Sequence, residues 1–264
     1  MDPIDLTRLN ATFMDRNVRP TLLFQDGKYA IYWIGVPEDS AFRNNSYLIT
    51  DGTEALLIDP GGHNDFPVIN QQIKQIISSM PVTAMVFCHQ DPDAAGSMAD
   101  WLALNPGMNV ITAAVTNLIL PHFGRSDYSF FNINEEPFFS FGSGHKLRFF
   151  EAPFLHSPGA FVTYDETSGF LFSGDIWAAI DMDWRLVVEN FPAHVLKMNL
   201  YHINHMASNI AARGFVGRIR NLLLKAILPQ HGSIIPEKFI PQAMDYLLRL
   251  KCGLDLVYPD IKQK

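Results

Sequence analysis

The first part of the chain alternates short apolar runs with turn residues, a pattern that predicts β-strands. Apolar and β-forming residues fill 29–34, 47–49 and 55–58, and Asp51–Gly52 separates the last two runs. Two such runs joined by Asp-Gly are a strong hairpin signal. The second run ends at Asp59-Pro60-Gly61-Gly62, where a strand stops. We therefore predict several strands within the first sixty residues.

The middle of the chain changes to helical spacing and back. From Pro67 to Pro81, apolar residues recur three and four apart, which predicts an amphipathic helix. Residues 82–88 are apolar and β-forming, so we expect a buried strand there. A helix is expected at 97–104 and another strand at 109–112. This alternation of strand and helix is typical of α/β proteins.

The second half of the chain begins with strand-like segments and then becomes helical. The expected elements are strands at 147–150, 160–164 and 169–173, a mostly helical region at 177–224, a strand at 226–228 and a helix at 240–250. No repeat, low-complexity stretch or linker interrupts the pattern. We therefore expect a single domain over residues 1–264.

Composition and charge narrow the classes of function. The 264 residues are 48% hydrophobic with a formal net charge of −7, and their basic side chains form only a mild cluster on a predicted helix face. We therefore expect no nucleic-acid partner. No apolar run reaches the roughly 18 residues of a membrane span, and Met1–Asp5 lacks signal-peptide features. The two isolated cysteines, Cys88 and Cys252, form no disulfide framework, so we expect a cytoplasmic protein.

The first candidate site residues follow the predicted strand at 82–88. His89, Asp91 and Asp93 occupy alternate positions, and alternate side chains of extended backbone point the same way. Pro92 restricts its own backbone and biases Asp91 away from helix. Two carboxylates this close repel each other, and a bound metal ion compensates them. A simple Asp-Pro-Asp turn has the same letters, so these residues alone leave both interpretations open.

Three later candidates share one local context. Each follows an apolar, strand-like segment and has small or turn-forming residues beside it. Sites in α/β folds gather at strand ends. One such placement is ordinary, but four in one chain are hard to explain as buried structural residues. We therefore predict a metal site built from His89, Asp91, Asp93, His156, Asp175 and His231.

The ordered motifs resemble the metallo-β-lactamase-like diiron domain of the flavodiiron proteins. His89-Gln90-Asp91-Pro92-Asp93-Ala94 matches most of the first ligand motif of that family, and Pro229-Gln230-His231-Gly232 is similar to the last. Asn45–Ile49, Leu57–Gly61 and Leu171–Asp175 also resemble the family, so the likeness covers nearly the whole chain. It implies an α/β (α+β) fold, the four-layer αββα metallo-β-lactamase-like sandwich.

The resemblance also implies how the ligands divide between two metal ions. Metal one would take His89, Asp91, His156 and a bridging Asp175, and metal two would take Asp93, Asp175 and His231. The implied cofactors are two iron ions. A mixture of imidazole and carboxylate ligands also suits zinc or manganese, so these are the alternative metals.

Two departures from the family pattern affect the site. Asp91 stands where the family usually has Glu, so the arm is shorter by one methylene. Ala94 stands where the family has a second-site His, and alanine offers no donor atom. We therefore expect the second site to be weak or more open. His63, His145 and His205 are the candidate replacements, although a surface or core role is the simpler interpretation of each.

Flavodiiron proteins carry a flavodoxin-like domain after this one. Only about thirty residues follow His231 here, and there is no Gly-rich phosphate loop. We therefore expect that this chain binds no FMN and that any electrons for turnover come from another protein. The resemblance makes the stand-alone oxygen-binding diiron proteins the nearest functional model.

Three functions stay open at this point. The leading hypothesis is a non-haem diiron protein that binds or reduces O2 or NO, as an oxygen sensor or as an oxidoreductase with an external electron donor. The alternatives are a metal-dependent hydrolase of the metallo-β-lactamase superfamily and a non-catalytic metal-binding signalling module. Hydrolases of this fold usually have His at the position of Asp91, so Asp91 favours iron. Because the family's site faces a partner subunit, we also expect a homodimer.

An aromatic-rich segment has two interpretations. Tyr128–Phe131, Phe138, Phe139 and Phe141 lie close together in the sequence. Packing in the core or against a second subunit is the simpler explanation. The functional alternative is an apolar wall that shields a diiron site and admits a diatomic gas.

Overall fold

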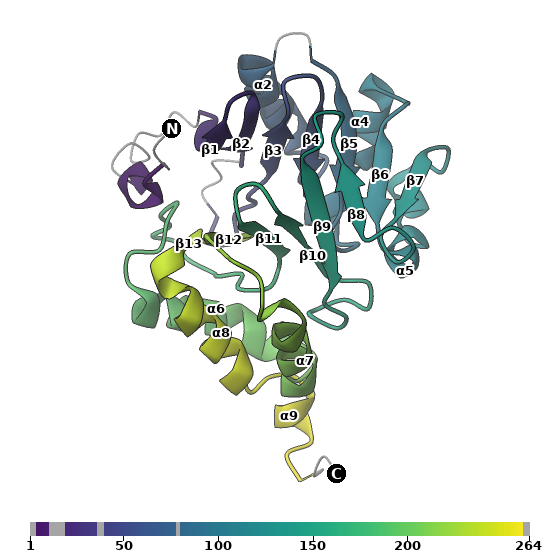
Figure 1. Cartoon of the computed structure of the whole chain (residues 1–264). Helices are drawn as coiled ribbons and strands as arrows, with labels where there is room; N and C mark the ends of the chain where they lie inside the picture. Colours follow the sequence, from purple (N-terminus) through teal and green to yellow (C-terminus); the bar gives the residue numbers. More distant parts are fainter. Residues whose placement is uncertain (1–3, 11–18, 36–39, 78–79, 261–264) are drawn as a thin grey trace.

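The computed structural model describes residues 4–10, 19–35, 40–77 and 80–260. Its centre is a pair of facing β-sheets (Figure 1). The first sheet has seven strands in the order β1-β2-β3-β4-β5-β6-β7, and the second has six in the order β13-β12-β11-β10-β9-β8. Helices α2 and α4 cover the outer face of the first sheet, and α6, α7 and α8 cover that of the second (Figure 1).

The bounds of the elements are as follows. The strands are β1 (Thr21–Asp26), β2 (Tyr29–Trp33), β3 (Tyr47–Thr50), β4 (Ala55–Ile58), β5 (Val82–Val86), β6 (Asn109–Thr112), β7 (Ser129–Asn132), β8 (Phe138–Ser140), β9 (Lys146–Glu151), β10 (Phe161–Asp165), β11 (Phe170–Gly174), β12 (Ala226–Pro229) and β13 (Ile235–Pro236). The helices are α2 (Phe66–Ile76), α3 (Pro92–Ala95), α4 (Met98–Leu104), α5 (Ala114–Asn117), α6 (Phe191–His205), α7 (Asn209–Ile219), α8 (Ile240–Arg249) and α9 (Leu254–Val257), with 3-10 turns η1 (Leu6–Arg8), η2 (Leu120–Phe123) and η3 (Glu237–Phe239).

Strand β4 shows why the layers form. Successive side chains of a strand point to opposite faces. Leu56 and Ile58 therefore pack between the two sheets, while Ala55 and Leu57 pack against the helices outside the first sheet. All four side chains are buried. Every position of the strand is apolar because both of its faces are covered.

The second sheet repeats this arrangement on its own outer face. Phe170 and Phe172 of β11 enter the core between the sheets, and Leu171 packs with the helices on the other side. The fold thus has three apolar layers, one between the sheets and one under each set of helices. This confirms the expected four-layer αββα fold.

Most predicted elements lie where the sequence pattern placed them, but the helical region expected at 177–224 is wrong over its first part. Helix α6 begins only at Phe191, where the Asn190 side chain accepts a hydrogen bond from the Ala193 N–H. The preceding segment bonds to distant backbone instead: the Val188 N–H donates to the Ile234 carbonyl and the Asp181 N–H to the Ala41 carbonyl. These long-range bonds replace the bonds that a helix would make within itself.

Strand direction sets the position of the candidate ligands. Strands β4 to β7 run parallel in the first sheet, and β11 and β12 run parallel in the second. Their carboxyl ends meet at one edge of the sandwich, where sites form in such sheets. His89 follows β5, Asp175 follows β11 and His231 follows β12. Within the described ranges, none of the helices is both long and apolar enough to cross a membrane.

Candidate metal centre

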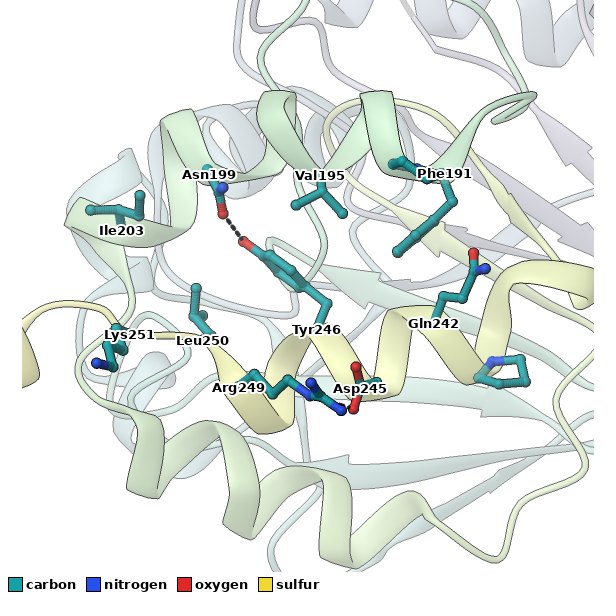
Figure 2. Close-up of a pocket in the computed structure, with 12 residues that line it drawn as sticks. Phe191, Val195, Asn199, Ile203, Gln242, Asp245, Tyr246, Arg249, Leu250 and Lys251 are labelled. Carbon is teal, nitrogen blue, oxygen red and sulfur yellow. Dashed lines mark hydrogen bonds and ion pairs between the residues drawn. The ribbon is translucent and has the colours of Figure 1, made fainter.

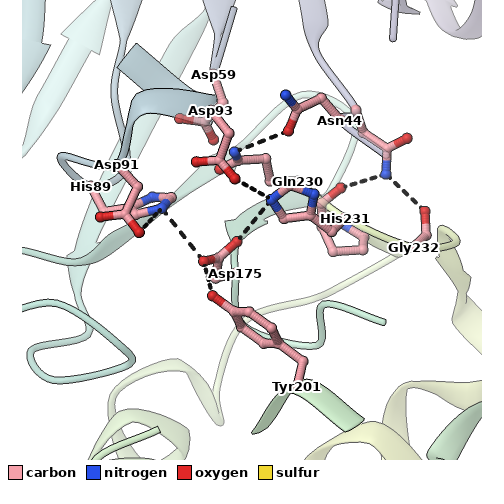
Figure 3. A network of polar contacts seen from close by, with 12 residues as sticks. Asn44, Asp59, His89, Asp91, Asp93, Asp175, Tyr201, Gln230, His231 and Gly232 are labelled. Carbon is pink, nitrogen blue, oxygen red and sulfur yellow. Dashed lines mark hydrogen bonds and ion pairs between the residues drawn. The ribbon is translucent and has the colours of Figure 1, made fainter. Parts of the chain in front are cut away.

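The structure brings all six predicted ligands together at this edge of the two sheets (Figure 3). They come from four separate segments of the chain. His89 follows β5, Asp91 and Asp93 lie at the start of α3, His156 lies in the loop after β9, and the last two follow β11 and β12.

Asp175 lies at the centre of the group. Its Oδ2 atom is 2.9 Å from His156 Nε2 and 3.4 Å from His89 Nε2. Its Oδ1 atom is 3.5 Å from His231 Nε2. The two oxygens of one carboxylate thus face two different sets of histidines, which is the geometry of a bridging ligand.

The two peripheral aspartates divide between these sets. Asp91 Oδ2 is 3.4 Å from His156 Nε2 and 3.9 Å from His89 Nε2. Asp93 Oδ2 is 3.1 Å from His231 Nε2. This division is the one that the family resemblance implied for metal one and metal two.

Several of these atoms are buried without a hydrogen-bond partner. They are the Nε2 atoms of His89, His156 and His231 and one carboxylate oxygen each of Asp93 and Asp175. Their short contacts with one another therefore lack the geometry of hydrogen bonds. A buried polar atom without a partner costs about 1–3 kcal/mol, so a cluster of five is unfavourable unless something else binds them. Imidazole nitrogens and carboxylate oxygens are ligands for iron, zinc and manganese, so the donor set fits a pair of such ions.

Electrostatics within the cluster support the same conclusion. Burial alone would raise the pKa of Asp175, but the facing histidines, His89 first among them, lower it well below its ordinary value. Burial would lower the pKa of His156 and of His231, yet the close carboxylates raise both, Asp175 at His156 and Asp93 at His231. The carboxylates thus draw positive charge into the site as protons, and a metal ion supplies the same charge while satisfying the open nitrogens.

The backbone at the first motif differs from the extended run that we predicted. Asp91 is extended, with φ −69° and ψ 149°, but Pro92 begins helix α3 and Asp93 lies in its first turn. Proline is favoured at this position because its fixed φ suits a helix and its missing N–H has no helical partner there. Both carboxylates still lie with His89 in one group whose ligand atoms are within 4.8 Å of each other.

No described histidine takes the place of the ligand missing at Ala94, which is fully buried in α3. His63 is paired with Asp100 at 2.7 Å, and His145 with the Thr167 hydroxyl at 2.9 Å. His205 lies nearer, its ring 6.3 Å from that of His156, but it is stacked on another aromatic ring. The structure therefore supports the simpler interpretation of His63 and His145, a surface or core role.

Two aromatic residues at the site were not predicted. The Tyr201 hydroxyl, from α6, donates a hydrogen bond to Asp175 Oδ2 (Figure 3). Phe42 stacks on His231, with ring centroids 3.6 Å apart and an interplanar angle of 15°. Phe42 also stacks on Tyr201. The sequence carried no signal for either, because Tyr201 fits an ordinary helical spacing and Phe42 precedes the first recognised motif.

Two buried polar side chains, Asp59 and Cys88, lie next to His89, and the sequence did not indicate this contact either. Asp59 Oδ1 accepts a hydrogen bond from the Cys88 N–H, and burial raises the pKa of Asp59 to about 6. Burial raises the pKa of the Cys88 thiol well above its ordinary value, so the sulfur keeps its hydrogen. Cys88 is buried as predicted, but its contacts make it part of the site.

A groove of about 760 Å³ lies elsewhere, between α6 and α8 (Figure 2). Figure 2 shows Phe191, Val195 and Tyr246 facing into it, and the Tyr246 hydroxyl donates to Asn199 Oδ1 at 3.0 Å. None of the six predicted ligands lines this groove. Its size alone therefore does not make it the metal site.

The aromatic segment is explained by packing. Phe131, Phe139 and Phe141 pack in or against the core between the sheets, with rings meeting edge to face. The candidate ligand His231 is covered by Phe42 instead. The structure therefore supports the packing interpretation of this segment over an apolar wall around the site.

Fold and site together define the class: this is a metallo-β-lactamase-like protein with a candidate two-metal centre of His and Asp. Residues 42–232 match the sequence profile of a family described as "ODP family beta lactamase". The match covers well over half of the chain, so this protein belongs to the ODP family.

Solved structures agree with this assignment. The chain has a TM-score of 0.80 and 31% identity to the apo state of the chemotaxis sensor ODP from T. denticola, covering 92% of this chain and 99% of that one. A structure described as the peroxy diiron species of chemotaxis sensor ODP gives a TM-score of 0.81 at 30% identity over the same shares. The flavodiiron protein from Giardia intestinalis, at 19% identity with a TM-score of 0.77, shares the fold over 88% of this chain and 59% of its own.

Curated relatives are longer than this chain. The anaerobic nitric oxide reductase flavorubredoxin of Vibrio vulnificus is 26% identical over 245 residues, which is 83% of this chain and 49% of that protein. The diflavin flavoprotein A 1 of Synechocystis is 30% identical over 134 residues, 50% of this chain and 23% of that protein. The chain therefore spans less than half the length of these two relatives.

Proposed function

We propose that this protein holds two iron ions in the six-residue site and binds O2 or NO there as a sensor. The observation that carries the proposal is the convergence of five buried, partnerless ligand atoms from four segments of the chain. The likeness to the ODP sensor over nearly the full length of both chains supports a sensing role. Asp91, Asp93, Asp175 and the three histidines are the proposed ligands, with Asp175 as the bridge.

The ligand set of the first site favours iron. His89, His156 and Asp91 give two imidazoles and one carboxylate on one side of the bridge. Two histidines and a carboxylate with open positions are characteristic of non-haem iron that reacts with O2. Bound reduced iron would supply electrons to a diatomic ligand. The protein's own contribution is to fix the ligands and to leave Asp91 and His156 partly exposed, at 37% and 17% of their side-chain surface.

Residues around the site orient and shield these ligands. Tyr201 holds one oxygen of Asp175 through its hydroxyl. His231 is held by its Nδ1 atom, which lies 2.9 Å from the Arg43 carbonyl, and is covered by Phe42. A hydrogen bond from Nδ1 to a carbonyl keeps a histidine in the tautomer whose Nε2 binds metal. Water and a small gas therefore reach the site from the side where Asp91, Asp93 and His156 are partly exposed.

An anaerobic oxygen titration tests this function. The protein is loaded with Fe(II), its iron is counted, and O2 is then added while the visible spectrum is recorded. We expect two iron ions per chain and a new absorption band after O2. His156→Ala should abolish the band, whereas His63→Ala, which removes an exposed histidine paired with Asp100, should not. Iron that does not bind, or a spectrum that O2 leaves unchanged, would contradict the proposal.

The oxidoreductase alternative requires an electron donor from another protein. The likeness to flavorubredoxin supports a reductase fold, but this chain matches under half of that protein. Steady-state consumption of O2 or NO with an artificial donor separates the two roles. Slow consumption by an iron-loaded protein that still binds O2 supports the sensor, and rapid turnover supports the reductase.

We also propose that residues 1–264 act as one domain and that the chain forms a homodimer. The three apolar layers share the same two sheets, which supports one folding unit. On α6, Leu196 and Leu200 are 68% and 60% exposed, one turn apart, and offer an apolar surface for a second copy. Light scattering at working concentration tests the dimer, and a monomer at all concentrations would contradict it.

A further inference from the structure

The side chain of Cys88 lies where three ligand-bearing segments meet. It directly precedes His89, and its Sγ atom is 2.9 Å from His89 Nδ1. The same sulfur is 3.7 Å from the side-chain oxygen of Gln230, the residue before His231. A Cβ added at Gly174, the residue before Asp175, would stand 2.5 Å from this sulfur. One buried atom therefore contacts the neighbours of ligands from both halves of the site.

Gly174 is needed at that position for two reasons. Its φ is +53°, a conformation that residues with a Cβ rarely adopt. Its missing side chain also leaves the space that the Cys88 sulfur fills. The strand that delivers Asp175 therefore packs directly on the thiol.

The hydrogen bonds from His89 onward lead to acceptors on both sides of the thiol. Metal binding through Nε2 requires that the His89 Nδ1 atom carries the hydrogen, so Nδ1–H donates to the sulfur. The thiol hydrogen then donates to the Gln230 oxygen at 3.7 Å, and the buried Asp59 carboxylate is a second acceptor for it. The Gln230 amide donates to Asn44 Oδ1 at 3.4 Å, and the Asn44 amide donates to Asp65 Oδ2 at 3.0 Å. The chain ends on a carboxylate, which only accepts.

These contacts differ from the usual support of a metal-binding histidine. Such a histidine commonly donates to a carboxylate or a backbone carbonyl, as the Arg43 carbonyl offers to His231. His89 has a thiol in that place, and the buried carboxylate of Asp59 hydrogen-bonds to Cys88 and not to the His89 ring. Cys88, Gln230 and His89 are all buried, at 4%, 1% and 2% exposure. In the unchanged protein the thiol therefore shields the Nδ1 nitrogen of His89 from solvent water.

We propose that Cys88 is a positioning residue of the metal centre. Its thiol fixes His89 with Nε2 toward metal one, and through Gln230 it links that ligand to the segment that carries His231. This inference rests on the proposed metal site, but it is independent of whether the bound metal reacts with O2.

Zinc-loaded protein with ¹⁵N-labelled histidine tests the inference without oxygen chemistry. The His89 Nδ1–H signal, assigned from a His89→Gln spectrum, should exchange slowly with water in the unchanged protein. In Cys88→Ala this signal should exchange rapidly, and zinc affinity of the first site should fall about 10-fold, as for lost supporting contacts elsewhere. Cys88→Ser keeps a donor and an acceptor, so its signal should persist at a changed position with an intermediate affinity.

The second cysteine provides a matched control. Cys252 is also fully buried, but it packs with the helices outside the second sheet. Cys252→Ala should leave the His89 signal and zinc affinity unchanged. The inference is overturned if Cys88→Ala leaves both as they were, or if Cys252→Ala changes them equally.

A second variant keeps the test decisive if Cys88→Ala folds poorly. Gln230→Leu removes the acceptor of the thiol hydrogen while keeping a similar volume. It should weaken zinc binding at the first site although Gln230 is next to a ligand of the second, and a first site that keeps full affinity would contradict the link. A protein that binds zinc normally with an unaffected His89 contradicts this inference alone, whereas a protein that binds no metal contradicts the proposed function.

Discussion

The two halves of the proposed metal centre share Asp175 but differ in how they are built. The first half has two histidines and Asp91 besides the bridge, and one of these histidines, His156, has 17% of its side chain exposed. The second half has only Asp93 and His231 besides the bridge, because Ala94 offers no donor. Its histidine, His231, has 1% of its side chain exposed and lies under Phe42, whereas Asp93 is as exposed as Asp91, at 37%.

The comparison shows that the number of ligands at a metal site and the burial of those ligands vary independently. The first half has the larger ligand set and therefore should bind metal more tightly. The second half has fewer ligands, and its metal keeps more positions for other ligands. An asymmetric pair of this kind suits the binding of a small molecule at one metal while the other holds the structure together.

The largest effect is expected where the two halves meet. Asp175→Ala removes a ligand from both metals and leaves His89, His156 and His231 without the carboxylate they face. Zinc or iron affinity should fall by at least about 100-fold at both sites, beyond the roughly 10- to 100-fold caused by losing a supporting contact. Calorimetric metal titration measures this. One site that keeps its affinity would show that Asp175 does not bridge.

A second prediction concerns His202, a buried histidine of α6 that contacts the backbone next to Asp175. His202 of α6 accepts a hydrogen bond from the Trp177 N–H, two residues after Asp175, and burial lowers the pKa of His202 to about 4. The unfolded chain takes up this proton near pH 6.5, so the folded state loses stability as pH falls from about 6.5 to about 4. At about 1.4 kcal/mol per pH unit, His202 contributes roughly 3 kcal/mol to that loss.

His202→Gln should remove this part of the acid dependence. Urea unfolding of the metal-free protein at several pH values measures it, and stability of the variant should fall less between pH 6.5 and 4. The raised pKa of Asp59, about 6, acts in the opposite direction but is present in both proteins, so their difference isolates His202. Equal slopes in the variant and the original protein would contradict the assignment.

Restoring the missing ligand tests the asymmetry itself. Ala94→His places an imidazole where the resembled family has one. We expect affinity at the second site to rise about 10-fold, with the first site unchanged, because a ligand is worth at least as much as a supporting contact. Ala94→Asn is a control for added volume in the buried α3. If both variants bind the second metal no better than the original protein, the missing ligand is not the cause of the difference.

The smallest effect is expected at Tyr201. Tyr201→Phe keeps the ring between Phe42 and His205 but removes the hydroxyl that donates to Asp175. A hydrogen bond to a charged group contributes about 1.5–3 kcal/mol at most, and bound metal takes over part of the carboxylate charge. We therefore expect metal affinity to change by a few-fold, measured by competition with a chelator. A loss as large as that of Asp175→Ala would mean that Tyr201 does more than orient the bridge.

The sequence could place three of the proposed ligands because each directly follows a strand. His89, Asp175 and His231 follow apolar runs that could only be buried strands, and parallel strands bring such ends to one edge. The same apolar runs predicted the buried strands of the two sheets. The two-metal division came from the resemblance and not from spacing.

What the sequence did not predict depends on contacts between distant segments. Phe42 lies next to His231, and Tyr201 next to Asp175, only because the chain folds, and neither pair has a periodic signal. The absence of helix before Phe191 has the same origin, since backbone bonds to distant carbonyls replaced local ones. Cys88 was predicted as a buried strand residue from its apolar neighbours, but its contact with Gln230 spans 142 positions.

An anomalous-scattering map at the iron edge, from crystals of protein loaded anaerobically with Fe(II), tests the central claim most directly. We predict two iron peaks on either side of Asp175, roughly 4 Å or less apart as in other two-metal sites. His89, Asp91 and His156 should bind the first ion, and Asp93 and His231 the second. No peak among these six residues, or iron bound elsewhere, would contradict the account.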